Sequence, residues 1–356
     1  MSDILDGNAV IYCEGAFGTT DGKTAHGLVR FTKRYRVIAV IDSHCAGRDA
    51  GQILDGKNNG IPVLATLDEA MDAGGKHRPT HFVIGLAPAG GQLNSAAGKN
   101  VKNALSKGLN VDCGLHHFLS EDPEMVLLAR ENGVSIRDIR KPPPRDQLHF
   151  FSGKISEVKS FRVAVLGTDS AVGKRTTSWI LTEEFQKAGV KAEMIGTGQT
   201  AWLQGAQFGV ILDSLINDFV SGEIEHAVWS AWDKQKPQVM IIEGQGSLMN
   251  PAYPGGFEIL AATKPHVIVF QHAPARKHYD GFPGFSIHPL AQQIQVLELL
   301  SERPVAAVTI NHEALDKNHI PMVCSVMETT LGVPVFDVLV DGASDLVQTL
   351  QRYMTP

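Results

Sequence analysis

Short apolar runs rich in β-branched residues alternate with longer amphipathic stretches along the whole chain. Many of the short runs end at a glycine or an aspartate, as is typical of strands that are buried on both faces of a parallel sheet. The longer stretches have the apolar spacing of helices that cover such a sheet. The alternation therefore predicts an α/β fold built on parallel sheets.

Two series of such elements follow one another. The first has predicted strands at residues 9–13, 37–41, 82–86, 110–113 and 135–139, with helices at 24–30, 67–73, 97–107 and 123–132. The second has predicted strands at residues 162–166, 192–195, 239–242, 267–270, 305–310 and 335–337. Between them, three successive prolines from Pro142 to Pro144 remove backbone donors and interrupt regular structure. A chain of 356 residues also favours two domains, which we place at residues 1–145 and 146–356.

Composition and charge narrow the class of protein. Apolar residues make up 43% and charged residues 20% of the chain, which is typical of a folded globular protein. The net charge of -6 and the scattered lysines and arginines give no basic field for a nucleic acid. The four cysteines lie far apart without the spacing of metal ligands, and no long apolar stretch predicts a signal peptide or a membrane span. We therefore expect a cytoplasmic protein with no membrane and no nucleic-acid partner.

A phosphate-binding loop is the clearest chemical motif. The predicted strand at residues 162–166 leads into Gly167, and Gly173-Lys174 opens the next helix. Small residues let consecutive N–H groups point inward, a helix N-terminus lies behind them, and a lysine can meet outer phosphates. The candidate phosphate ligands are Thr168, Asp169, Ser170, Ala171, Val172, Gly173, Lys174, Arg175 and Thr176.

Two features distinguish this loop from the common GxxxxGK[ST] pattern. Gly167 lies six residues before Gly173 rather than five, a spacing that resembles dethiobiotin synthetase. Arg175 stands where the hydroxyl that ligates Mg²⁺ is expected, and Thr176 follows one place later. A guanidinium at this position suits a phosphate that arrives without metal, such as the pyrophosphate of coenzyme A.

Further candidates follow other predicted strands of the second half. Glu243 ends one strand, at the edge where parallel sheets bind ligands, and can act as a base, a metal ligand or a cap of the Gly-rich turn after it. Asp213 follows a short apolar run and is a candidate for the same crevice. His272 and Arg276 lie in a segment dense in titratable groups, where a histidine can take a proton and an arginine can hold a carboxylate.

The first half has a weaker signal. Residues 13–20 follow its first predicted strand and Asp42 ends the second, in imitation of a Rossmann turn with its ribose-binding acid. The full GxGxxG spacing is missing. A nucleotide site and a degenerate domain used for packing or subunit contact both remain open.

Several short motifs occur together in order: KTAHGL at residues 23–28, GRDAG at 47–51, GIP at 60–62, the phosphate loop, GQT at 198–200 and QH at 271–272. In this combination the chain resembles the D-glutamate N-acetyltransferases over nearly its whole length, from residue 8 to about residue 350. The resemblance implies a Rossmann-like N-terminal domain, a P-loop C-terminal domain, and acetyl transfer from acetyl-CoA to the amine of D-glutamate.

In this hypothesis the loop holds the phosphates of acetyl-CoA, Glu243 or a nearby histidine is the base, and Arg276 clamps a carboxylate of the substrate. No metal is required, and we expect a small-molecule amino-acid substrate and a homo-oligomer. One alternative is an ATP- or GTP-dependent ligase or kinase of the dethiobiotin synthetase type, which would use Lys174, Thr176, Asp213 and Glu243 around Mg²⁺. Another is a nucleotide-sensing regulatory protein without turnover.

Overall fold

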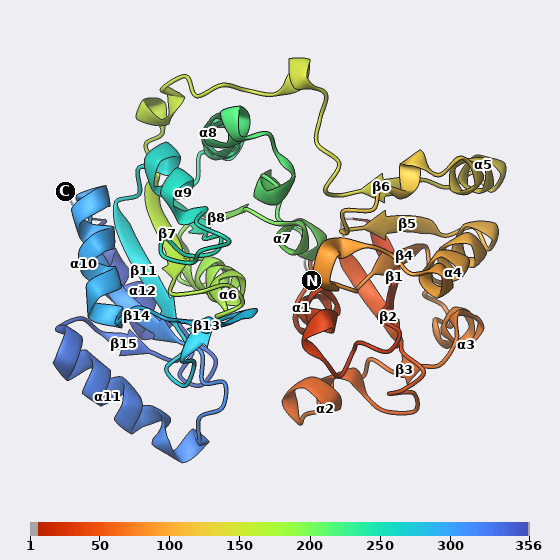
Figure 1. Cartoon of the computed structure of the whole chain (residues 1–356), viewed down its shortest axis with the longest axis horizontal. Coiled ribbons are helices and arrows are strands. Elements are labelled where there is room, and N and C mark those ends of the chain that lie inside the picture. Colours follow the sequence, from red (N-terminus) through yellow and green to blue (C-terminus); the bar gives the residue numbers. More distant parts are fainter. Residues whose placement is uncertain (1–5, 355–356) are drawn as a thin grey trace. The chain divides into compact units, whose positions relative to one another are not determined.

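The computed structural model describes residues 6–354, which divide into two compact units. One unit contains the residues up to Pro142 together with the short segment Gln199–Gly205. The other contains Pro143–Gly198 and the residues from Ala206 on. Each unit has its own parallel sheet covered by helices, so the predicted α/β class with two domains is confirmed (Figure 1).

The first unit is built on a six-stranded parallel sheet in the order β3-β2-β1-β4-β5-β6. This is the strand order of the doubly wound dinucleotide-binding fold. The strands are β1 (Gly7–Tyr12), β2 (Tyr35–Ile41), β3 (Val63–Leu64), β4 (His81–Ile84), β5 (Asn110–Cys113) and β6 (Ile136–Asp138). The helices are α1 (Lys23–Arg30), α2 (Ala50–Asp55), α3 (Leu67–Ala73), α4 (Ser95–Ser106) and α5 (Pro123–Glu131).

Alternating side chains of the strands separate the core of this unit into two layers. On one face, Val10 and Phe82 pack with residues of α3, α4 and α5. On the other face, Ile11 and Val83 pack with residues of α1 and α2. Both faces are therefore buried, which explains why these strands read as continuous apolar runs.

The short helix α7 (Gln199–Gln204) belongs to the first unit although it follows a strand of the second. Leu203 is fully buried in the core layer beside α1 and α2. The guanidinium of Arg34 lies over the ring of Trp202, 3.7 Å from its centroid, and the side chain of Gln204 donates to the carbonyl of Gly27 at 2.8 Å. The first unit therefore completes its core with residues from the second half of the chain.

The second unit has a seven-stranded parallel sheet in the order β15-β14-β11-β7-β10-β8-β9 and a separate hairpin of β12 and β13. The strands are β7 (Phe161–Gly167), β8 (Ala192–Gly196), β9 (Phe208–Gly209), β10 (Val239–Glu243), β11 (Val267–His272), β12 (His278–Tyr279), β13 (Phe282–Ser286), β14 (Val305–Ile310) and β15 (Val335–Phe336). The helices are α6 (Lys174–Lys187), α8 (Asn217–Gln235), α9 (Gly256–Thr263), α10 (Leu290–Ser301), α11 (Ile320–Leu331) and α12 (Ser344–Gln351).

The second core is also divided by the sheet. Val165 and Val269 face α6 and α12, whereas Leu166 and Phe270 face α8, α9 and α10. Because the strands are parallel, the carboxyl ends of β11, β7, β10 and β8 follow one another along one edge. Polar segments that are far apart in the sequence meet there.

The predicted elements are present, whereas no bounds were predicted for helices α8 to α12, and several short elements were not predicted. The helix predicted from residue 97 begins at Ser95, because the side chain of Asn94 caps its first turn by accepting from the N–H of Ala97. Helix α2 and strands β3 and β9 have six residues or fewer and little periodicity, and the β12–β13 hairpin contains Gly281, Pro283 and Gly284.

We expect Leu203→Ala to destabilise the first unit by about 2–5 kcal/mol, since it leaves a cavity in a closed core. Hydrogen exchange of the amides in β1 and β4 would measure the loss. Gln207→Ala, at an exposed position just after the segment, is the matched control. If both substitutions leave exchange unchanged, α7 does not contribute to the core of the first unit.

Candidate functional site

The loop between β7 and α6 has the backbone of an anion-binding site. Ala171 and Gly173 have φ values of 53° and 108°, in the left-handed region, and these two bends turn the chain around a centre. Among residues 6–354, the N–H groups of Ala171, Val172, Gly173 and Lys174 donate to no other protein group. Unbonded N–H groups at a helix N-terminus bind phosphate oxygens.

Lys174 supplies the positive charge of the loop. Its side chain is buried, with 7% of the residue exposed, and Nζ donates to the carbonyl of Asp169 at 2.6 Å. Burial lowers the pKa of Lys174 to about 8, with Arg276 acting in the same direction and with Asp169 and Glu243 opposing. The ammonium is therefore largely present at pH 7 and is lost as the pH rises above 8.

The absence of a side chain at Gly244 leaves room for the side chain of Lys174. A Cβ atom at Gly244 would lie 2.4 Å from the carbonyl oxygen of Val165 and 3.0 Å from Cδ of Lys174. Only glycine therefore lets the chain leave β10 beside the lysine stem.

The carboxylate of Asp169 is fully buried and accepts hydrogen bonds on both oxygens. Oδ1 accepts from the N–H of Ser170 at 2.7 Å and from Nδ2 of Asn250 at 2.8 Å. Oδ2 accepts from Nη1 of Arg276 at 2.9 Å and from the N–H of Asp280 at 2.8 Å. Asp169 thus ties the phosphate loop to the segment after β10 and to the segment after β11, and holds the loop rather than a ligand.

Arg276 fixes the loop in the same way. Nη1 also donates to the carbonyl of Ser170 at 2.7 Å, while Nε and Nη2 contact Oε1 of Glu313 at 2.8 and 2.7 Å. The sequence led us to expect a clamp for a substrate carboxylate at Arg276. In the structure its guanidinium is paired with two carboxylates of the protein, which gives it a positioning role.

His272 ends β11 beside the first residue of the loop. Its Nδ1 lies 3.0 Å from Oγ1 of Thr168, whose N–H donates to the carbonyl of Gln271 at 3.0 Å. Burial, and then the positive charge of Arg276, lower the pKa of His272 to about 4. The ring is therefore neutral near pH 7 and has one nitrogen able to accept a proton.

Glu243 lies on the other side of Lys174. Oε2 accepts from the N–H of Thr197 at 2.8 Å, and the residue is buried. Burial raises the pKa of Glu243, while Arg175, the Thr197 N–H and Lys174 oppose that rise. Its closest electrostatic partners are therefore the two cations that open α6.

The side chain of Gln271 joins three elements behind the loop. Its Oε1 accepts from Oγ1 of Thr177 on α6 and from Oγ1 of Thr309 on β14, both at 2.6 Å. The sequence did not single out Asn250, Glu313 or these two threonines as site residues. Only Gln271 had a signal, as part of the QH motif.

The remaining candidates are less closely joined. Asp213 is exposed in the 3-10 turn Leu212–Ser214, which the N–H of Leu212 fastens to the carbonyl of Thr197 at 3.2 Å. Thr176 is half-buried on the first turn of α6. The structure thus groups Thr168, Asp169, Lys174, Glu243, His272 and Arg276, with Asp213 at the border.

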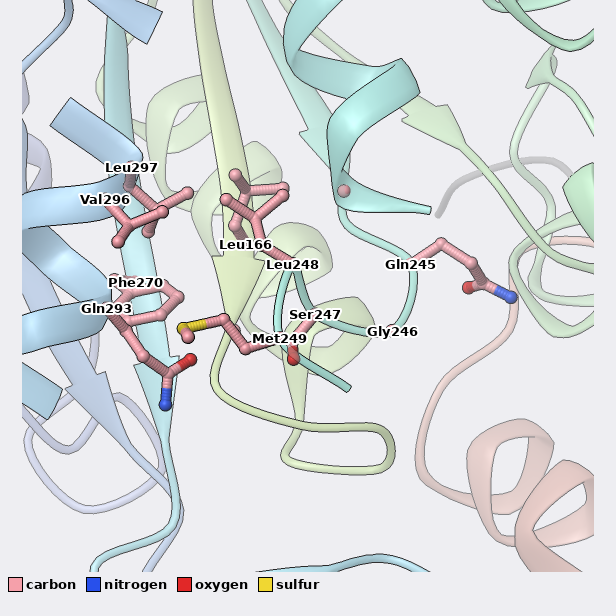
Figure 2. Close-up of a pocket in the computed structure, with 12 residues that line it drawn as sticks. Leu166, Gln245, Gly246, Ser247, Leu248, Met249, Phe270, Gln293, Val296 and Leu297 are labelled. Carbon is pink, nitrogen blue, oxygen red and sulfur yellow. The ribbon is translucent and has the colours of Figure 1, made fainter. Parts of the chain in front are cut away.

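A small recess opens beside the loop on the α10 face of the sheet (Figure 2). Its enclosed volume is about 10 Å³, which is roughly the room that one water molecule or a methyl group needs. It is lined by Leu166, Gly167, Gln245, Gly246, Ser247, Leu248, Met249, Gly256, Phe270, Gln293, Val296 and Leu297.

In the first unit, the carboxylate of Asp42 accepts hydrogen bonds from backbone N–H groups of the same unit. Oδ2 of Asp42 accepts from the N–H of Phe17 at 2.8 Å, and Oδ1 accepts from the N–H of His44 at 2.9 Å. Asp42 therefore fixes the turns after β1 and β2, which supports the packing interpretation of this domain.

In residues 6–354, no helix has the length and apolar character needed to span a bilayer. Nor do three or more His, Cys, Asp or Glu side chains of this part of the chain gather as ligands for a metal ion.

Both halves of the chain match known families. Residues 149–347 match "Domain of unknown function (DUF1611_C) P-loop domain", and residues 43–142 match "Domain of unknown function (DUF1611_N) Rossmann-like domain". A crystal structure of a DUF1611 family protein from Anabaena variabilis has a TM-score of 0.90 and 28% sequence identity, and the match covers 98% of this chain and 100% of that one. These matches confirm the predicted Rossmann-like and P-loop folds.

Two relatives bear the name D-glutamate N-acetyltransferase. The one from Tritonibacter scottomollicae is 31% identical over 83% of this chain and 86% of its own length. The one from a Pseudoalteromonas species is 30% identical over 82% of this chain and 88% of its own length. The resemblance drawn from the sequence motifs is therefore confirmed.

We expect Asp169→Asn to lower the free energy of unfolding of the second unit by about 1–3 kcal/mol, because an NH2 group replaces one accepting oxygen of the buried carboxylate and Arg276 keeps only Glu313 as a charged partner. Urea denaturation would measure this loss. Asp233→Asn, in the exposed pair with Lys236, should cost less than about 1 kcal/mol. Equal effects of the two substitutions would show that Asp169 does not hold the loop.

Proposed function

We propose that this chain, which belongs to the DUF1611 family and is an N-acetyltransferase, transfers the acetyl group of acetyl-CoA to the amine of D-glutamate. The observation that carries this proposal is the phosphate loop, in which unbonded N–H groups and Lys174 converge while Arg175 replaces the usual Mg²⁺-binding hydroxyl. The names of the two relatives support the acceptor.

The phosphates of CoA suit the loop chemically. The N–H groups from Ala171 to Lys174 can each donate to a phosphate oxygen, and the ammonium adds a charge-assisted bond. Arg175 on the first turn of α6 adds a second cation near the same helix end. In this role the loop binds and orients the donor, and no phosphoryl group is transferred.

The acyl transfer itself needs a base close to the thioester. We assign that role to His272, which is neutral near pH 7 and lies at the end of β11 beside Thr168. The neutral amine of the substrate attacks the thioester carbonyl carbon, so that a C–N bond forms and the C–S bond breaks. The proton leaving the nitrogen passes to Nε2 of His272 and then to the sulfur of CoA, which departs as the thiol.

For Nε2 to accept this proton, Nδ1–H of His272 must donate to Oγ1 of Thr168. Thr168 therefore orients the ring, and its hydroxyl can accept from Nδ1–H in this tautomer. Glu243, buried beside Lys174 and Arg175, balances the charge of the two cations that meet the phosphates.

The direct test is to incubate the protein with acetyl-CoA and, separately, D-glutamate, L-glutamate and D-aspartate, with EDTA present. We expect mass spectrometry to show the N-acetylated product with D-glutamate, together with free CoA thiol. Turnover of ATP that EDTA abolishes, without acetylated product, would instead support a ligase or kinase.

We expect Lys174→Ala to weaken CoA binding by roughly 10- to 100-fold, as is usual when one charge-assisted hydrogen bond to a phosphate is lost. Calorimetry with CoA would measure this change. Lys187→Ala, at the exposed end of the same helix, is the matched control and should bind CoA normally. Unchanged affinity in Lys174→Ala would show that the phosphates of CoA do not bind in the loop.

The affinity for CoA should also depend on pH. Because the pKa of Lys174 is lowered to about 8, the ammonium is present below that pH and is lost above it. We therefore expect binding to weaken above pH 8, by up to about tenfold per pH unit. Titrations between pH 7 and pH 9.5 would show this slope in the wild type but not in Lys174→Ala; equal slopes would contradict the assignment.

We expect His272→Gln to lower kcat by about 10²–10⁴-fold while leaving the affinity for CoA nearly unchanged, because it removes a general base and no phosphate ligand. Steady-state kinetics and calorimetry together would separate the two quantities. His278→Gln, at an exposed position of the hairpin, is the control. A fall in CoA affinity with kcat preserved would place His272 outside the proton transfer.

A further inference from the structure

The recess beside the phosphate loop is suited to an uncharged group. Six of its lining side chains are apolar, namely Leu166, Leu248, Met249, Phe270, Val296 and Leu297, and none of the described residues that line it is charged. A substrate with two carboxylates would lose its hydration there without a cation to replace it. The recess therefore does not suit glutamate, whereas an acyl chain would gain by burial.

Two buried polar side chains line the recess, Ser247 and Gln293, and Oγ of Ser247 already accepts from the N–H of Asn250 at 3.1 Å. Gln293 is 3% exposed, and its Nε2 donates to the carbonyl of His288 at 2.9 Å. This bond fixes the amide, and Figure 2 shows its carbonyl oxygen turned toward Met249. Within residues 6–354, no hydrogen bond reaches that oxygen. It is placed to accept from an amide N–H, a group that the pantetheine arm of CoA carries near its thioester.

The recess and the proposed base lie on the same side of the sheet. Side chains two residues apart on a strand share a face, so His272 lies on the same face of β11 as Phe270, and Thr168 is the first residue after β7. Leu166 and Phe270 form the floor of the recess, and Thr168 pairs with His272 at 3.0 Å. A thioester whose acyl group enters the recess would lie on the same face of β11 as His272, which is two residues beyond Phe270.

We infer that this recess binds the acyl group of the donor thioester and that Met249 limits the length of the chain that is transferred. This inference rests on the proposed function. Figure 2 shows the side chain of Met249 extending toward Phe270 and Gln293, where it occupies the space that a longer chain would need. Val296 and Leu297 form the opposite wall on α10.

The test compares acetyl-, propionyl- and butyryl-CoA as donors for the full chain and its variants. Met249→Ala should raise kcat/KM for butyryl-CoA relative to acetyl-CoA by about 10-fold or more, at roughly fourfold for each methylene that gains a buried site. The affinity for CoA itself, which has no acyl group, should not change.

Val296→Phe fills the recess from the opposite wall and should shift the preference the other way, with propionyl- and butyryl-CoA losing more than acetyl-CoA. Leu299→Phe is the matched control, because Leu299 lies on the same helix with 81% of its surface exposed. It should leave the preference unchanged. Thermal unfolding of each variant would verify that it is folded.

The outcomes separate this inference from the proposed function. If Met249→Ala and Val296→Phe shift the preference in opposite directions at constant CoA affinity, the acyl site is supported. If acetyl transfer and CoA binding persist but neither folded variant changes the preference, the inference is overturned and the proposed function stands. If the wild type neither binds CoA nor transfers an acetyl group, the proposed function is wrong, and the inference that rests on it is wrong as well.

Discussion

At the carboxyl edge of the second sheet, the buried carboxylate of Asp169 accepts hydrogen bonds from its neighbour Ser170 and from two segments that are distant in the sequence. A buried charge is costly unless it is fully compensated, so each donor must stay in place. The conformation of the phosphate loop is therefore coupled to the segment of Asn250 and to the segment of Arg276 and Asp280. The same bonds hold the unbonded N–H groups from Ala171 to Lys174 around one centre.

The charges of the site are nearly balanced before any ligand arrives. The three cations are Lys174, Arg175 and Arg276, and the three carboxylates near them are Asp169, Glu243 and Glu313. Their attraction offsets part of the free-energy cost of burying each charge. The field for an anion therefore comes mainly from the backbone N–H groups and the end of α6. A bound phosphate would also favour the charged form of Lys174, whose pKa burial has lowered to about 8.

The sequence predicted what is local and missed what is long-range. Gly173 and Lys174 revealed the loop because its backbone depends on adjacent residues, and continuous apolar runs revealed the central strands. The sequence could not show that Arg276 pairs with Asp169, since 107 positions separate them and a polar residue near a strand end reads equally well as a substrate ligand. Leu203 was missed for a similar reason: it lies in a short helix of the second half of the chain but is buried in the core of the first unit.

A phosphate loop in an acyltransferase is consistent with where the reaction takes place. In phosphoryl transfer the loop and its metal act on the phosphorus atom itself. In acyl transfer from CoA the reacting carbon lies at the far end of a long donor, so the loop contributes binding that is equal in the ground state and the transition state. In the proposed mechanism the group that lowers the barrier is therefore not a phosphate ligand, and that role is assigned to the neutral imidazole of His272, at the end of β11 beside the first residue of the loop.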